Sequence, residues 1–269
     1  MTQQAILVAG AGGRMGRAVT AEILKTPGVT LAGGFERPDS AFIGADLGNL
    51  AGLDALGLRV ETSPAQGLKH ASALIDFTTP EASLANARAA AGAGVAHILG
   101  TTGLAREQEA EIAALAKKIP IVKSGNMSLG VNLLAALVEE AARRLSDDYD
   151  IEIIEAHHRE KVDAPSGTAL MLARAAAAGR GVDLEAKAVR ARDGEIGSRR
   201  AGDIGFAVIR GGGIVGAHEV LFAGSQEVIT LAHSALDRGL FAKGAVAAAR
   251  WAAGKPPGLY SMRDVLGLG

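Results

Sequence analysis

The chain of 269 residues contains no cysteine. Disulfide bonds and thiolate metal sites are therefore excluded, and an intracellular protein is expected. Aromatic residues are also scarce, at 3% of the chain, whereas glycine occurs 36 times. This composition suits a closely packed α/β protein with many tight turns, and the length allows one large or two medium domains.

The sequence also lacks an excess of charge of one sign and any long apolar run. The 28 basic and 29 acidic residues leave a formal net charge of -1, which predicts no nucleic acid and no anionic membrane among its partners. No apolar stretch approaches the roughly 18 residues of a membrane span. The chain begins directly with an apolar strand pattern and shows no signal-peptide pattern. Together these features predict a cytoplasmic protein.

The first half of the chain alternates short apolar runs with helical patterns. The apolar runs have the length of buried strands and lie at 5–10, 29–35, 73–77, 95–100 and 120–124. Helical patterns lie at 15–26, 81–94 and 105–118. Strands and helices in alternation predict βαβ units, and hence a Rossmann-like, doubly wound parallel sheet.

The pattern changes after about residue 128. A long amphipathic helix is expected at 129–145, and strand-like runs follow at 149–158, 186–192, 204–212, 216–224 and 226–235. Because most of these strands lack helices between them, they predict a second α+β domain with an antiparallel or mixed sheet. A helical pattern returns at 238–254. We therefore expect a dinucleotide-binding domain from residues 1–127 with 239–269, and a second domain from 128–238.

Glycines cluster where the first strand passes into the first helix. In ILVAGAGGRMGRAV, residues 6–19, Met15 stands where the pattern G-x-G-x-x-G has its third glycine, and Gly10, Gly13 and Gly16 fall three apart. A structural glycine-rich turn is the simpler alternative. The position between a strand and a helix start favours a dinucleotide loop, because glycines let a pyrophosphate approach the backbone amides there.

Three charged residues bear on the choice of cofactor. Glu36 lies about 20 residues beyond the loop, where a carboxylate takes the ribose hydroxyls. The neighbouring Arg37 can pair with the 2′-phosphate of NADPH, or else it is a solvated loop residue. Arg14 adds positive charge inside the loop. These residues predict that both NADH and NADPH are accepted.

The run EAHHREKVDAPSGTALMLA, residues 155–173, carries the chemistry of the second half. Pro165 and Ser166 mark a helix start, and its amides, with the hydroxyls of Ser166 and Thr168, would form an anion site. Lys161 can place an ammonium group on the same anion.

The histidines of the chain allow two interpretations. His157 and His158 are adjacent and lack the i, i+4 spacing of a helical metal pair, so no metal is expected. Each is either a structural histidine or, beside Lys161, a group for proton transfer or anion binding. The remaining histidines are expected to be solvated or structural, namely His70, His97, His218 and His233.

Six segments of the sequence occur together along nearly the whole chain. They are VAGAGGRMG, DFTTPE, GTTG, NMSLGVNLL, EAHHREKVDAPSGTAL and GLYSMRDVLGL. In this combination the sequence resembles the 4-hydroxy-tetrahydrodipicolinate reductase (dihydrodipicolinate reductase) family of lysine and diaminopimelate biosynthesis. The resemblance implies NADH or NADPH as the reductant, a small dicarboxylate as the substrate, and a homotetramer joined through the sheets of the second domain.

The resemblance also assigns roles to matching residues. On the cofactor side it places Gly13, Arg14 and Met15 at the pyrophosphate and Glu36 and Arg37 at the ribose. The residues implied at the nicotinamide are Phe77, Thr78, Gly100, Thr101, Thr102 and Gly103. Asn126, Met127 and Ser128 would form the far wall and the hinge, and Arg238 and Phe241 would reach towards the cofactor. On the substrate side it makes His157 the acid and Lys161 a carboxylate ligand, with His158, Ser166, Gly167 and Thr168 completing the pocket. Met127 stands where many relatives have an aromatic residue.

Two other functions share the glycine loop. An NAD(P)-binding redox sensor without chemistry of its own could lose the acid and the anion site. Another amino-acid dehydrogenase, of the aspartate or homoserine type, would not need the run H-H-x-x-K-x-D-A-P-S-G-T. Because the chain retains both features, the reductase is the preferred hypothesis. Both the hydroxylated and the dehydrated form of the ring remain compatible with these residues.

Overall fold

The structure is a computed structural model that describes residues 3–268. Met1, Thr2 and Gly269, at the ends of the expected dinucleotide domain, lie outside the described residues. The chain divides into two compact units, which we call unit 1, Met1–Leu129 with Gly239–Gly269, and unit 2, Gly130–Arg238. Unit 1 is therefore interrupted in the sequence by the whole of unit 2.

Unit 1 is built on a parallel sheet of seven strands in the order β12-β6-β5-β4-β1-β2-β3. The strands are β1 (Gln4–Ala9), β2 (Val29–Phe35), β3 (Val60–Glu61), β4 (Ala73–Asp76), β5 (Ala96–Leu99), β6 (Pro120–Lys123) and β12 (Gly258–Tyr260). The strand order reverses between β1 and β4, and ligands of such sheets bind beyond the carboxyl ends of the strands at this point. The predicted Rossmann-like fold is confirmed.

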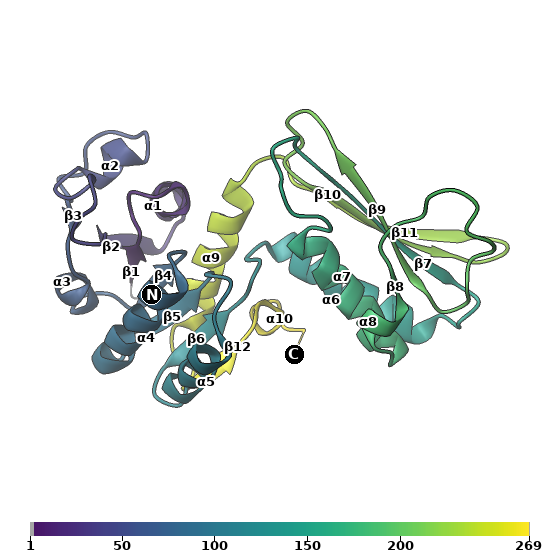
Figure 1. The fold of residues 1–269 in the computed structure, drawn as a ribbon. Helices are drawn as coiled ribbons and strands as arrows, with labels where there is room; N and C mark the ends of the chain where they lie inside the picture. Colours follow the sequence, from purple (N-terminus) through teal and green to yellow (C-terminus); the bar gives the residue numbers. More distant parts are fainter. Residues whose placement is uncertain (1–2, 269) are drawn as a thin grey trace. The chain divides into compact units, whose positions relative to one another are not determined.

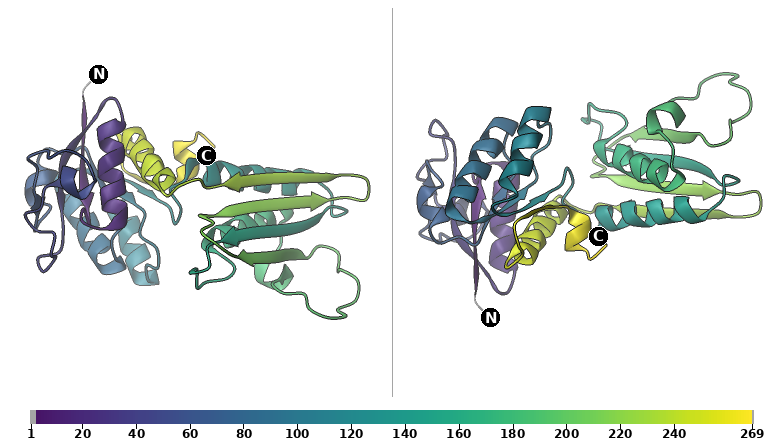
Figure 2. Two further views of the ribbon diagram at one scale, coloured as in Figure 1. Left: turned by 90° about the horizontal axis from the view of Figure 1, so that it is seen from above. Right: turned by 90° about the horizontal axis from the view of Figure 1, so that it is seen from below.

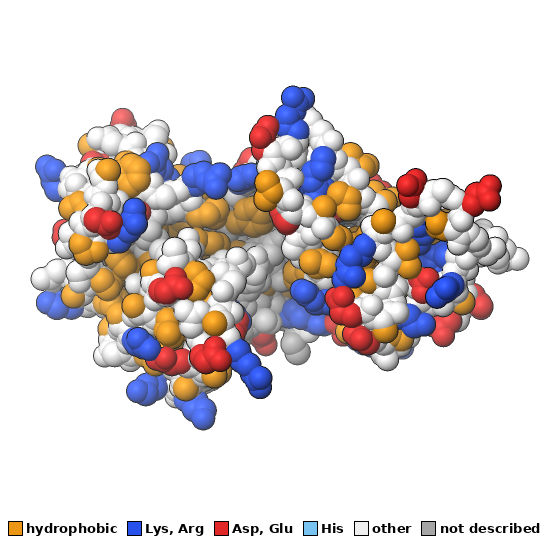
Figure 3. All heavy atoms as spheres, in the orientation of Figure 1, with side chains coloured by type: hydrophobic (Ala, Val, Ile, Leu, Met, Phe, Trp, Pro, Cys, Tyr) orange, Lys and Arg blue, Asp and Glu red, His pale blue; other side chains and the backbone are white. Residues whose placement is uncertain are grey.

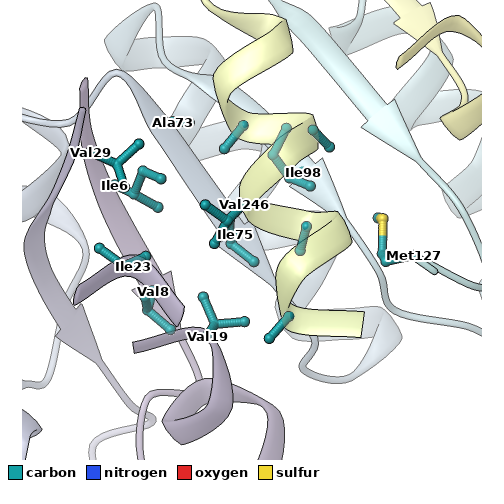
Figure 4. Close-up of a cluster of buried hydrophobic side chains, with 14 of the residues drawn as sticks. Ile6, Val8, Val19, Ile23, Val29, Ala73, Ile75, Ile98, Met127 and Val246 are labelled. Atoms are coloured by element: carbon teal, nitrogen blue, oxygen red, sulfur yellow. The ribbon is translucent and has the colours of Figure 1, made fainter. Parts of the chain in front are cut away.

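Helices cover both faces of this sheet (Figures 1 and 2). On one face, α1 (Arg14–Lys25) and α9 (Gly239–Ala252) pack on alternate strand residues such as Ile6, Val8 and Ile75 (Figure 4). On the other face, α3 (Ala65–Leu68), α4 (Pro80–Ala93) and α5 (Arg106–Leu115) pack on the intervening residues, among them Leu7 and Leu74. Successive strand residues thus enter opposite cores, which explains the nearly continuous apolar runs.

Several short elements of unit 1 were not predicted. These are α2 (Leu47–Leu50), α3, β3, β12 and α10 (Met262–Val265), each two to four residues long. A segment of this length is too short to display a helical or strand period. Tertiary contacts define it instead, as where β12 pairs with β6 at the edge of the sheet.

Unit 2 contains a mixed sheet of five strands in the order β11-β10-β7-β9-β8. The strands are β7 (Asp150–His157), β8 (Ala188–Val189), β9 (Ile204–Arg210), β10 (Ala217–Ala223) and β11 (Val228–Ser234). Strand β10 is antiparallel to β7 and β11, whereas β9 is parallel to β7 and β8. The predicted mixed sheet is confirmed, although the run at 186–192 forms only the two residues of β8.

One face of the unit 2 sheet is covered by helices (Figure 1). The helices are α6 (Leu129–Arg144), α7 (Gly167–Arg180) and the short α8 (Leu184–Lys187). Their apolar residues, such as Val138 and Leu172, pack on Ile151, Ile153 and Phe222 of the sheet. Strand β7 alternates between half-buried and buried residues, so Glu155 and His157 continue the buried row that begins with Ile151.

The surface carries charges of both signs. On the face drawn in Figure 3, basic and acidic side chains are interspersed over each unit. Within residues 3–268, no helix has both the length and the apolar character needed to cross a membrane.

Candidate active site

The glycine loop of unit 1 requires glycine at particular positions. Gly10 has a positive φ of 63°. A Cβ atom on Gly16 would lie only 2.1 Å from the carbonyl oxygen of Gly10, so the start of α1 packs directly on the loop. Met15 is half-buried and packs against the core cluster shared with α9. The departure from G-x-G-x-x-G is thus a shift of the packing glycine from position 15 to position 16.

The start of α1 suits a bound anion. Gly13 is the N-cap residue and provides no side-chain hydrogen bond to the first turn. Amides of this turn, such as those of Arg14 and Met15, therefore have no side-chain cap, and a helix start of this kind favours negative charge. Arg14 is exposed at the same place. A dinucleotide pyrophosphate fits this loop.

Glu36 and Arg37 differ in their surroundings. The Gly12 amide donates a hydrogen bond to Glu36 Oε1 at 3.0 Å, so this carboxylate lies beside the glycine loop. Arg37 Nε lies 3.4 Å from Asp39 Oδ1, and both side chains are about three-quarters exposed. The structure brings Glu36 to the loop and leaves the Arg37 guanidinium in solvent.

The residues assigned to the nicotinamide side lie in the next loops along the sheet edge. A Cβ on Gly10 would lie 3.0 Å from Thr78 Cγ2, so the loops after β1 and β4 touch. A Cβ on Gly100 would lie 2.2 Å from the Phe77 ring, so the loops after β4 and β5 touch as well. The exposed residues Thr102 and Gly103 continue the loop after β5.

Sequence reasoning gave no role to Asp76, which holds these loops together. Its carboxylate is fully buried and accepts hydrogen bonds from the Thr78 amide at 2.9 Å, Thr78 Oγ1 at 2.7 Å and Asn86 Nδ2 at 2.9 Å. Thr101 Oγ1 lies 3.4 Å away and His97 Nε2 lies 3.3 Å away. Burial raises the pKa of Asp76, but His97 and the other hydrogen bonds outweigh it and lower the pKa to about 2. His97 is structural, as expected.

The turn after β6 places Met127 in the core of unit 1. Asn126 Oδ1 accepts a hydrogen bond from the Ser128 amide at 2.9 Å, and Ser128 is buried. The Met127 side chain is only 1% exposed and packs in the core beside α9 (Figure 4). It therefore anchors the turn to the core.

In unit 2, a buried carboxylate holds His157. His157 Nδ1 lies 2.6 Å from Glu155 Oε2. The Glu155 carboxylate also accepts two hydrogen bonds from Arg210, both at 2.8 Å, and one from the Ser166 amide at 3.0 Å. Burial raises the pKa of Glu155, but the hydrogen bonds from Arg210, His157 and Ser166 outweigh it, so the pKa is lowered. Glu155 is therefore ionised at neutral pH.

A second buried histidine, His218 of β10, borders His157. The two rings meet edge to face with centroids 5.1 Å apart, and His218 Nε2 lies 3.1 Å from Ser166 Oγ. Burial lowers the pKa of His218 to about 4, and the charge of His157 acts in the same direction. His218 is thus neutral at physiological pH. The sequence predicted only a solvated or structural histidine here, and its place beside His157 follows from the pairing of β10 with β7.

The start of α7 lies against the same carboxylate. Ser166 is the N-cap residue, and its hydroxyl accepts a hydrogen bond from the Ala169 amide at 3.1 Å. Ser166 is 2% exposed, so its side chain shapes the helix start, while the following Gly167 is exposed. Thr168, the next residue of the helix, is half-buried.

Three further residues were assigned to the site, two in unit 2 and one in unit 1. Lys161 Nζ donates to Asp163 Oδ1 at 2.8 Å in the loop between β7 and α7. Arg238, the last residue of unit 2, has a guanidinium nitrogen 3.4 Å from His158 Nε2. Phe241 is a half-buried residue of α9 in unit 1. Within residues 3–268, no group of three or more His, Asp or Glu side chains is arranged to hold a metal ion.

Two family models match this chain and together cover nearly all of it. Residues 4–127 match the N-terminal domain of dihydrodipicolinate reductase, and residues 130–266 match its C-terminal domain. The two matched regions meet close to the boundary between unit 1 and unit 2.

Individual relatives agree with the family models. The chain is 55% identical, over all 269 residues and 99% of the relative, to 4-hydroxy-tetrahydrodipicolinate reductase of Rhodopseudomonas palustris (strain TIE-1). It is 55% identical over 264 residues, 98% of this chain and 96% of the relative, to the reductase of the same name from Rhizobium rhizogenes. The solved structure of dipicolinate-bound dihydrodipicolinate reductase from Paenisporosarcina sp. TG-14 has the same fold, with a TM-score of 0.78 at 22% identity over 97% of this chain and 98% of that one. This chain therefore belongs to the 4-hydroxy-tetrahydrodipicolinate reductase family, the NAD(P)H-dependent oxidoreductases that form tetrahydrodipicolinate for lysine and diaminopimelate biosynthesis.

Proposed function

We propose that unit 1 holds the nicotinamide cofactor and that unit 2 holds the cyclic dicarboxylate and protonates it. The assignment of the dicarboxylate to unit 2 depends on the cluster at the end of β7, where Glu155 contacts both His157 and the start of α7. The Paenisporosarcina relative binds dipicolinate, a ring with two carboxylates, which supports a dianionic ligand here. Because NADH and NADPH are regenerated in the cytoplasm, we place the enzyme there.

The loop and helix start after β7 carry the groups that would bind the two carboxylates. Lys161 supplies an ammonium group, which must exchange its ion pair with Asp163 for a substrate carboxylate. The exposed Gly167 lies at the first position of α7, where the helix dipole favours negative charge. His158 and Thr168 complete the pocket, and Ser166 acts by shaping the helix start.

His157 supplies the proton of the reaction. The hydroxylated ring must first lose water to give the conjugated C=C–C=N system, and the reduced nicotinamide, when bound, would supply a hydride to ring C4 of that system. His157, as an imidazolium, then delivers a proton to ring C3, so one hydride and one proton are added in all. Lys161 and the start of α7 hold the ring in the orientation that this transfer requires. The competing proposal has water donate the proton and leaves His157 as a binding residue.

A coupled assay tests the proposed activity directly. The product of the preceding synthase is supplied to the purified chain, and the absorbance of NADH or NADPH is followed in parallel reactions. We expect oxidation of both cofactors that depends on this substrate. Oxidation of neither cofactor by the folded protein would contradict the proposal.

Arg37 is expected to discriminate between the two cofactors. Arg37→Ala should raise the Kd of NADPH by about 10- to 100-fold, because a charge-assisted contact to the 2′-phosphate contributes about 1.5–3 kcal/mol. The Kd of NADH should change little, since Arg37 is exposed and its ion pair with Asp39 is solvated. The affinities are measured by calorimetry. Arg14→Ala is the matched control and should raise the Kd of NADH and the Kd of NADPH by the same factor. An equal rise of both Kd values in Arg37→Ala would show that Arg37 does not bind the phosphate.

We also propose that four copies assemble through the helix-free face of the unit 2 sheet. By the strand register, Ile154, Ile209, Leu221 and Val228 face this side, and Ile209 and Val228 are 51% and 58% exposed. Burial of such an apolar row between sheets is favourable. Sedimentation should give about four times the chain mass of 27.3 kDa. Ile209→Glu should dissociate the assembly. Leu24→Glu, at an equally apolar exposed site on α1, is the control and should leave the assembly intact. A wild-type protein that is monomeric at micromolar concentration would overturn the proposal.

A further inference from the structure

Glu155 and His157 are neighbours because of the period of β7. Side chains two residues apart on a strand point to the same face, and these two follow Ile151 and Ile153 on the face that packs against the helices. Glu155 is 1% exposed and His157 is 9% exposed. Their contact at 2.6 Å is therefore shielded from water.

The contact determines which nitrogen of His157 carries a proton in the neutral ring. An ionised carboxylate only accepts hydrogen bonds, so Nδ1 must donate to Glu155. Nε2 then remains for proton transfer. A Cβ on Gly216 would lie 3.1 Å from His157 Nε2, so glycine at this position leaves space beside the nitrogen.

The Glu155 carboxylate is itself held by two other elements, β9 and the start of α7. Arg210 at the end of β9 binds both of its oxygens, and Ser166 at the start of α7 donates its amide to Oε1. Arg210 is held in turn by a hydrogen bond to the Asp163 carbonyl oxygen at 2.7 Å. One carboxylate thus connects the proposed proton donor to the helix start where the substrate is proposed to bind.

The charges around His157 make this carboxylate important for the protonated ring. The surrounding charged and titratable groups are Glu155 on β7, Arg210 on β9, His218 on β10, His233 next to it on β11, and Lys161 with Asp163 in the following loop. Arg210 and Lys161 oppose a positive charge on His157. Among the described residues, Glu155 is the acidic group in hydrogen-bonding contact with His157.

We propose that Glu155 is a positioning residue for the proton donor His157. Glu155 holds the His157 ring in the Nδ1–H tautomer and stabilises its protonated form, and Arg210 fixes the Glu155 carboxylate. The inference rests on the proposed role of His157 as the acid. It extends that role to a hydrogen-bonded chain from the half-buried Arg210 through the buried Glu155 to His157, contributed by two neighbouring strands.

The test compares Glu155→Gln with a matched control on the same strand. Glu155→Gln keeps the size of the side chain and removes its charge. We expect kcat at neutral pH to fall by about 10- to 10⁴-fold, the range seen when a group that orients a functional histidine is lost. The pH at which kcat declines on the alkaline side should move lower, because the protonated ring loses its counter-charge. The KM of the dicarboxylate should change less, since glutamine can still accept from the Ser166 amide.

Glu152→Gln is the control. Glu152 also lies on β7 and binds two arginines, Arg192 and Arg199, but it is on the opposite face of the sheet from Glu155. Its replacement should leave the pH profile unchanged. Glu155→Asp provides a second variant if Glu155→Gln does not fold, since it keeps the charge but shortens the reach to His157 and should lower kcat less.

A spectroscopic readout on the ligand-free protein separates positioning from activity. The ¹⁵N shifts of the His157 ring should report the Nδ1–H tautomer in the wild type and in Glu152→Gln, and a mixture of tautomers in Glu155→Gln. An unchanged tautomer together with an unchanged pH profile would overturn the inference. If His157→Gln itself retains full kcat, the proposed acid role fails, and that result is distinct from a failure of Glu155.

Discussion

His157→Gln is expected to lower kcat by roughly 10²–10⁴, the usual contribution of a positioned general acid. Glutamine can still donate a hydrogen bond to Glu155, so the buried carboxylate keeps a partner on this side. It has no proton to release near neutral pH, and the step at ring C3 therefore loses its donor. The affinity for NADH should be nearly unchanged, because we assign the cofactor to unit 1. Steady-state kinetics and calorimetry measure the two quantities.

Lys161→Ala should change the kinetics in a different way from His157→Gln. Lys161 is proposed to bind a substrate carboxylate, so its loss should raise KM strongly and lower kcat only as far as the ring loses its orientation. A kcat for His157→Gln that stays near the wild-type value between about pH 6 and 8 would assign the proton to water and leave His157 a binding role.

The glycine loop illustrates what could be predicted from the sequence. Its place between a strand and a helix depends on local patterns, and the structure has β1 and α1 on either side of it. The sequence did not show which glycine of the helix start packs against the loop. That role depends on the 2.1 Å approach to the Gly10 carbonyl, which places it at Gly16.

The support of the candidate site was harder to predict because it is not local. Glu155 stands in the quoted motif, but its partner Arg210 is 55 residues away and is brought to it by the parallel pairing of β7 with β9. His218 reaches His157 through the antiparallel pairing of β7 with β10. A single sequence gives strand positions but not the register between strands, and that register makes these contacts.

Asp76 also supports the candidate site through residues distant in the sequence. Asp76→Asn should destabilise unit 1 by about 2–4 kcal/mol at neutral pH. In this variant an NH₂ group would replace the Asp76 oxygen that faces Asn86 Nδ2 and His97 Nε2. The side-chain NH₂ of Asn86 would then lose its acceptor in a buried site. Because Asp76 also holds Thr78 and lies close to Thr101, the Kd of NADH should rise as well. Urea unfolding and calorimetry measure the two effects.

The stability difference between the wild type and Asp76→Asn should shrink as the pH falls. Burial raises the pKa of Asp76, but His97, Thr78 and Asn86 together lower it from 3.8 to about 2. A carboxylate with a lowered folded pKa stabilises the fold fully above its unfolded pKa and loses that contribution as the pH falls towards 2. A shift of this size corresponds to about 2 kcal/mol. Asp39→Asn, at a side chain that is 73% exposed, is the control and should leave stability unchanged. If the difference for Asp76→Asn stays constant from pH 7 to about pH 3, the charge of Asp76 contributes nothing and only the geometry of its hydrogen bonds stabilises the loops.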